Sequence, residues 1–199
     1  MLEFHAVQEI EATTARLVEL LQEFKATLQR DGMASMDEYG DLLNWGLPNK
    51  NGMSRSLHVF DPGYCSFSDQ FYGTIHFHGG EIRGTILAGE VEHYTYQATK
   101  DANGDRFYAD DAYTLTKHTR RHGEGMTYIL PARVPHWIRP TMLTMTYFEE
   151  EDNGEMGDLV NPVTKDTDSH VWTQAEADAL LPRLLAMIDE RLARLSVLV

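Results

Sequence analysis

The sequence predicts a mainly β protein in which a central barrel or sandwich of short strands is flanked by helices at both ends. Between Arg55 and Phe148, at least seven runs rich in β-branched and aromatic residues alternate with Gly, Pro, Asp and Asn. Amphipathic helical patterns precede and follow this region. We therefore expect one domain with three parts: a helical segment over 1–54, the barrel over 55–148, and an acidic loop followed by C-terminal helices over 149–199.

Apolar residues from Val7 to Gln29 recur at spacings of three, four and seven, which predicts the first helix. The helix is expected to end at Gly32. A second, short helix is predicted over Met36 to Trp45, before the turn-rich stretch at 46–52.

The C-terminal segment begins as a helix at Thr173, because Thr173 and Glu176 have the spacing of a capping box. Pro182 lies inside the apolar pattern that follows, which predicts a kink or two stacked helices. Neither terminal helix can bury its apolar stripe alone. We expect the helices to pack on the outside of the barrel, on each other, or across a homodimer interface.

The composition excludes several classes of partner and site. With 17 Lys and Arg against 31 Asp and Glu, the net charge is −14, which argues against binding to nucleic acid or to an anionic membrane surface. The single cysteine, Cys65, excludes a disulfide framework and a cysteine-only zinc site. No apolar run approaches about 18 residues and no signal peptide is visible, so we expect a cytoplasmic protein without membrane contact.

Two places in the β region carry candidate metal ligands. His76 and His78 are two residues apart in a predicted strand, so their side chains share one face and can bind one ion together. About 60 residues later, a segment with Gly125, Pro131 and His136 reads as a strand, a tight turn and the start of another strand.

This ordered pair of motifs resembles the cupin superfamily. His76 and His78 match the HxH of the first cupin motif, and Gly89 matches its closing glycine. Gly125, Pro131 and His136 match the second motif, with two departures: Arg133 stands where the family usually has Gly, and Pro140 where it has Asn. The resemblance covers about 90 residues. It implies a double-stranded β-helix (jelly-roll) barrel with His76, His78 and His136 on one metal ion inside it.

The fourth cupin ligand, a glutamate, has no clear counterpart. The family spacing puts it at Ile82 or Arg83, and the nearest carboxylate is Glu81, one position early. Counting back from Gly89 makes Ile82, Gly84, Ile86 and Ala88 the inward row and turns Glu81 outward. We therefore favour a three-histidine site slightly over a site that also includes Glu81.

The resemblance implies a mononuclear metalloenzyme acting on a small organic substrate. Three-histidine sites are similar to those of Fe(II) dioxygenases, so we expect Fe(II) and O2, with Ni, Mn, Cu or Zn as other candidate ions. Two alternatives stay open: a lyase or isomerase that uses the metal as a Lewis acid, and a small-molecule-binding cupin without catalysis.

Further residues are candidates for binding substrate or for catalysis: Tyr94, Tyr128 and Arg120. The tyrosines would present a hydroxyl to the substrate, and Arg120 would bind a carboxylate. His93 is expected to be a packed or hydrogen-bonded strand residue rather than a ligand.

Overall fold

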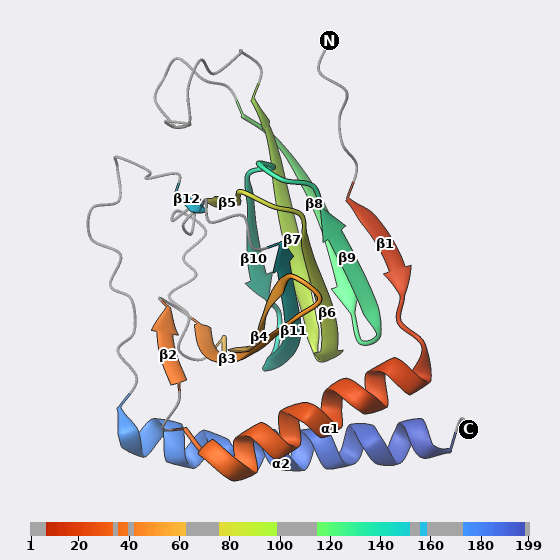
Figure 1. Ribbon diagram of the computed structural model, residues 1–199, viewed down its shortest axis with the longest axis vertical. Coiled ribbons are helices and arrows are strands. Elements are labelled where there is room, and N and C mark those ends of the chain that lie inside the picture. Colours follow the sequence, from red (N-terminus) through yellow and green to blue (C-terminus); the bar gives the residue numbers. More distant parts are fainter. Residues whose placement is uncertain are drawn as a thin grey trace.

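The computed structural model describes residues 7–33, 36–39, 42–62, 76–98, 115–151, 156–158 and 173–197. The strands in these ranges form two antiparallel sheets (Figure 1). The seven-stranded sheet has the order β1 (Gln8–Glu11), β9 (Met126–Leu130), β6 (Ile82–Ala88), β11 (Thr144–Glu151), β4 (Met53–Phe60), β3 (Leu42–Lys50) and β2 (Met36–Tyr39). The five-stranded sheet has the order β12 (Met156–Asp158), β5 (His76–His78), β10 (His136–Pro140), β7 (Glu90–Ala98) and β8 (Leu115–Gly123).

The strand order is that of a double-sheet jelly roll. From β4 to β11 the chain passes back and forth between the sheets, so that β9, β6, β11 and β4 are neighbours in one and β5, β10, β7 and β8 in the other. This pattern is two interleaved Greek keys, the fold that the cupins share with other jelly rolls. The predicted fold class is confirmed.

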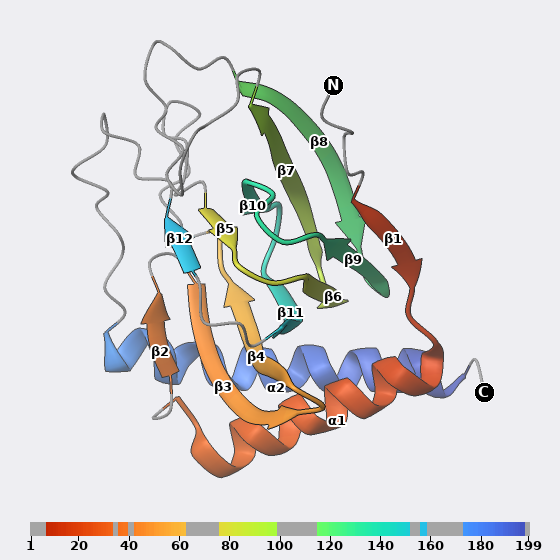
Figure 2. The same cartoon turned by 45° about the horizontal axis from the view of Figure 1, so that its top comes forward.

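Two apolar clusters lie on opposite sides of the seven-stranded sheet. One fills the space between the sheets, with Ile82 and Tyr128 from one sheet and Val91 from the other. The second lies on the outer face and joins Trp45 and Leu57 of the sheet to both helices, α1 (Thr14–Asp31) and α2 (Gln174–Ser196). Figures 1 and 2 show the two helices side by side beneath this face. The helices therefore pack outside the barrel, as expected.

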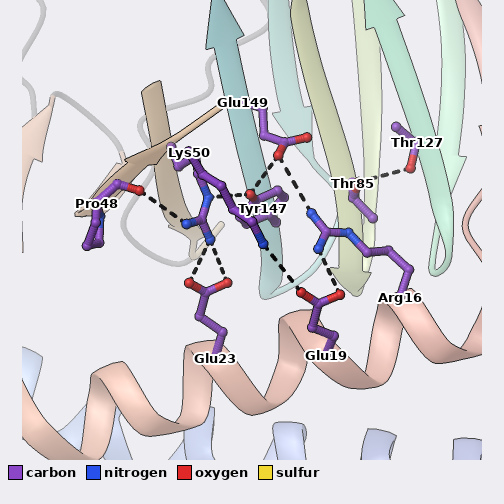
Figure 3. A network of polar contacts seen from close by, with 10 residues as sticks. Arg16, Glu19, Glu23, Pro48, Lys50, Thr85, Thr127, Tyr147 and Glu149 are labelled. Atoms are coloured by element: carbon purple, nitrogen blue, oxygen red, sulfur yellow. Dashed lines mark hydrogen bonds and ion pairs between the residues drawn. The ribbon is translucent and has the colours of Figure 1, made fainter. Parts of the chain in front are cut away.

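A buried arginine ties α1 to the seven-stranded sheet. Arg55 of β4 donates to the Tyr147 hydroxyl at 2.6 Å, to the Pro48 carbonyl at 3.1 Å, and to both carboxylate oxygens of Glu23 on α1 at 2.6 Å. Figure 3 shows this network between the helix and the sheet. Burial raises the pKa of Tyr147 to about 12, and Arg55 partly opposes that shift, so the phenol stays protonated at neutral pH.

The segment 1–54, which was expected to be helical, also contributes strands. A helix predicted over Met36 to Trp45 was wrong: β2 and the start of β3 occupy this stretch. In β3, the alternating residues Leu43, Trp45 and Leu47 are buried against the helices, which is the period-two pattern of a strand. Packing against the helices thus decided the local structure.

The C-terminal part differs from the expectation in two respects. The capping box at Thr173 is present, and α2 continues through Pro182 as one helix whose proline is exposed to solvent. The acidic region after Phe148 begins with strand rather than loop, since β11 extends to Glu151 and β12 follows. Neither described helix is long and apolar enough to cross a membrane.

Candidate metal centre

The backbone register places the two histidine motifs side by side. His136, the first residue of β10, pairs with His76 of β5, so these residues share a face of the five-stranded sheet. His78 lies two residues further on β5 and therefore on the same face. The side chain of His76 lies outside the described part of the structure. The rings of His78 and His136 are nearly parallel, with centroids 5.2 Å apart.

His78 lies beside a carboxylate that was not among the predicted site residues. Nδ1 of His78 lies 3.0 Å from Oε1 of Glu150, a residue near the end of β11. Both side chains are largely buried, and the His78 ring also contacts Phe148 at a centroid distance of 5.4 Å. An ionised carboxylate only accepts hydrogen bonds, so this contact favours a proton on Nδ1 of His78 and a lone pair on Nε2.

His136 is held in the same tautomer by the backbone. Its Nδ1 donates to the carbonyl oxygen of Val134 at 3.3 Å. The preceding turn is tied to β5 directly, because the amide of Arg133 donates to the His78 carbonyl at 2.8 Å. Arg133 has φ of 63°, the left-handed conformation that glycine adopts without strain. Arg133 stands where the cupin motif has glycine, and it adopts a backbone conformation that favours glycine.

The donor set fits a divalent transition-metal ion. Histidines that bind metals usually have their other ring nitrogen next to a carboxylate or a backbone carbonyl; Nδ1 of His136 donates to the Val134 carbonyl, and Nδ1 of His78 lies within ion-pair distance of the Glu150 carboxylate. Among the side chains that the structure describes, no group of three or more His, Cys, Asp or Glu is arranged to hold a metal ion. A third imidazole would come from His76, which the register places beside His136.

Two further histidines continue from His136 into the barrel. The His93 ring on β7 lies edge-on to the His136 ring, with centroids 5.3 Å apart. Nδ1 of His93 lies 3.3 Å from Nε2 of His122 on β8, and Nδ1 of His122 lies 3.2 Å from Oε1 of Glu9 on β1. His93 is thus a buried, packed residue with an imidazole partner.

Burial sets the protonation states in this part of the barrel. Desolvation lowers the pKa of His122, and Glu9 only partly opposes the shift, so the imidazole is neutral at pH 7. Desolvation raises the pKa of the Tyr128 phenol, which keeps this group protonated. The Tyr128 ring packs against both His93 and His122, at centroid distances of 4.6 and 5.2 Å.

Glu81 points to an arginine rather than to the histidines. Its Oε1 accepts from Nε and Nη2 of Arg83 at 3.0 and 2.8 Å, and both side chains are substantially exposed. Ile82, between them in sequence, is fully buried in the cluster between the sheets. The predicted inward row of β6 therefore ends at Ile86. Beyond Ile86 the register between β6 and β11 shifts, and Ala88 packs in the cluster beside the helices.

The other candidate residues are not all brought together. Tyr128 lies in the interior beside His93. Tyr94 lies on the opposite face of β7 from His93, and its hydroxyl donates to Glu92 at 2.5 Å. Arg120 is half-exposed, and its Nη1 lies 3.4 Å from Oε2 of Glu9. The structure therefore separates Tyr94 from the histidines and places Arg120 near Glu9.

Comparisons with known proteins find similarity only at the level of structure. No family model and no curated protein matches the sequence. Part of the chain is similar to the oxalate decarboxylase–formate complex of Lactobacillus farciminis (TM-score 0.42, 13% identity, 62% of this chain and 32% of that chain). It is also similar to a conserved protein of unknown function from Streptococcus pyogenes (0.36, 20%, 57% and 76%) and to hydroxypropylphosphonic acid epoxidase from S. wedmorenis (0.38, 12%, 55% and 50%).

The chain spans about a third of the oxalate decarboxylase and half of the epoxidase. The assignment of the fold rests on the strand order described above.

Proposed function

We propose that the barrel binds one divalent metal ion through His76, His78 and His136 and that the protein is a metal-dependent enzyme acting on a small organic substrate. One observation carries the proposal: His78 and His136 lie together in the interior with Nδ1 of each facing an acceptor, Glu150 and the Val134 carbonyl. This is the arrangement that fixes imidazoles for metal binding.

Fe(II) with O2 is the chemistry we favour. Imidazole ligands suit iron, and three protein ligands leave coordination positions of the ion open for small molecules. When bound, the ion would supply the activation of O2 or the polarisation of a substrate oxygen. Glu81 is not among the ligands we propose, because its carboxylate pairs with Arg83.

The residues of the chain supply orientation and a water-poor environment. The Val134 carbonyl, as a hydrogen-bond acceptor, and the Glu150 carboxylate, by its charge, favour a lone pair on Nε2 of His136 and His78. Ile82, Val91 and their neighbours in the interior cluster exclude water from the space between the sheets. Tyr128 stays protonated and offers a hydroxyl inside the barrel.

Metal content and oxygen consumption test the proposal. Protein purified without oxygen and loaded with Fe(II) should hold about one ion per chain, and His136→Ala should lose most of it while remaining folded by circular dichroism. His58→Gln is the matched control, since His58 contacts Phe148 from β4 and lies outside the proposed ligand set. Full iron occupancy in a folded His136→Ala protein would show that the ligand set is wrong.

The reaction type is tested separately with the same samples. An oxygen electrode should record O2 consumption in step with the loss of substrate, across a panel of small organic acids, diketones and thiols. If the substrate that reacts is turned over at the full rate without oxygen, the protein is a lyase or isomerase that uses the metal as a Lewis acid.

A further inference from the structure

Four buried histidines between the sheets form a continuous row. Ring centroids are 5.2 Å apart from His78 to His136, 5.3 Å from His136 to His93, and 5.4 Å from His93 to His122. All four side chains are buried, beside apolar residues such as Ile82 and Val91. Burying a polar ring costs about 1–3 kcal/mol unless it finds polar partners. Four buried imidazoles therefore stabilise the core less than apolar side chains of similar size would.

The His136 ring is enclosed from two sides. His78 lies nearly parallel to it, with 25° between the planes, and His93 meets it edge-on, with 77° between the planes. The hydrogen bond from Nδ1 to the Val134 carbonyl fixes one ring atom, and a ring held at one atom can still tilt. The edge contact with His93 restricts that tilt, because the close-packed interior leaves little room for movement.

His93 is itself fixed from behind. Nδ1 of His93 faces Nε2 of His122 at 3.3 Å, and Nδ1 of His122 faces the Glu9 carboxylate at 3.2 Å. The adjacent carboxylate favours a proton on Nδ1 of His122 by its charge; in that tautomer Nε2 of His122 accepts from Nδ1 of His93. Tyr128 packs on both rings. The tautomer and orientation of His93 therefore depend on Glu9.

We propose that Glu9, His122 and His93 form a positioning chain that holds the His136 ring in the orientation needed to bind the metal. The inference rests on the metal centre proposed above. The positioning chain begins at Glu9 on β1, an edge strand that pairs only with β9 in the seven-stranded sheet. A residue at the edge of this sheet thus controls the orientation of a metal ligand in the interior. Arg120 contributes by pairing with the other oxygen of Glu9, at 3.4 Å.

Co(II) binding to the full-length protein tests the positioning chain. Glu9→Leu removes the carboxylate, and Glu9→Gln keeps a carbonyl oxygen next to Nδ1 of His122. Glu11→Leu is the matched control, since Glu11 is an exposed glutamate of the same strand. We expect Glu9→Leu and His93→Leu to weaken Co(II) binding about tenfold, the lower end of what changes to the partners of metal ligands cost, because His93 contacts His136 through its ring edge and not through a hydrogen bond. Glu9→Gln should lie closer to wild type, and Glu11→Leu should be unchanged.

The absorption spectrum of bound Co(II) separates positioning from mere stability. A tilted His136 ring changes the ligand field, so the visible bands should shift in Glu9→Leu and His93→Leu and return in Glu9→Gln. Wild-type affinity and an unshifted spectrum in folded Glu9→Leu would refute the positioning chain while leaving the metal centre intact. Complete loss of binding in folded His93→Leu would make His93 a ligand and overturn the positioning role. If wild-type protein does not bind Co(II), the proposed function itself fails.

Discussion

Replacing Gly84 by alanine should disrupt the interior next to the histidine row. Gly84 lies in β6 directly opposite Tyr128 of β9, and both are buried. A Cβ atom added at Gly84 would lie 2.1 Å from Cζ and 2.2 Å from the hydroxyl oxygen of Tyr128. The tyrosine ring thus occupies the space that any larger residue would need.

The magnitude follows from this distance. Carbon atoms in contact are about 3.5–4.0 Å apart, so the ring must move by roughly 1.5 Å. Overpacking of this kind costs about 1–3 kcal/mol. Because Tyr128 is enclosed by His93 and His122, we expect the upper part of that range, about 2–3 kcal/mol. For a chain of this length, the midpoint of thermal unfolding should fall by roughly 5–10 °C.

Urea denaturation of Gly84→Ala measures the loss, with Gly46→Ala as control. Gly46 is also in a strand, but a Cβ added there meets nothing within 4 Å, so Gly46→Ala should stay within about 0.5 kcal/mol of wild type. In a Tyr128→Val background, Gly84→Ala should lose most of its effect, because the ring that causes the clash is gone. A free energy of unfolding for Gly84→Ala within about 0.5 kcal/mol of wild type would refute the packing argument.

Three further predictions concern stability. Arg133→Gly should raise the free energy of unfolding by about 0.5–1 kcal/mol, measured by urea denaturation. The strain that a left-handed arginine adds to the folded state is larger than the entropy that glycine adds to the unfolded state. A loss of stability would contradict this. Arg55→Met should lower the free energy of unfolding by about 2–3 kcal/mol, because the Tyr147 hydroxyl and Glu23 lose their buried partner. Lys50→Met is the control: Lys50 is exposed, and its loss should change the free energy of unfolding by less than about 0.5 kcal/mol. The lowered pKa of His122 means that the unfolded chain binds more protons, so stability should fall as the pH drops below about 6.5, by at most about 1.4 kcal/mol per pH unit for this group. His122→Leu should flatten the wild-type dependence measured between pH 7.5 and 5.5; equal slopes would contradict the assignment.

The barrel and the grouping of His78 with His136 could be predicted from the sequence. Period-two patterns and turn residues marked the strands after Arg55. The resemblance to the cupin motifs implied that His136 joins the His76–His78 pair, and the pairing of β5 with β10 puts His78 and His136 on one face of one sheet. The stretch at Met36 to Trp45 was misread because its apolar residues suit a helix locally. The buried positions Leu43 and Trp45 alternate, and this becomes decisive only once the helices cover that face.

The partners of the histidines could not be predicted from spacing. Glu150 and Glu9 are far in sequence from His78 and His122, and only the strand order brings each pair together. A weak signal was available for Glu150, because it alternates with the interior residue Phe148 along β11. Glu9 gave no such signal, since it lies at the start of a pattern that reads as a helix.

A crystal of the zinc-loaded protein, with anomalous scattering measured at the zinc edge, tests the metal centre most directly. We predict one peak between β5 and β10, with imidazole nitrogens of His76, His78 and His136 at about 2.0–2.1 Å and no oxygen of Glu81 in contact. A zinc-saturated crystal whose anomalous peak lies away from His78 and His136, or has Glu81 as a ligand, would contradict the account.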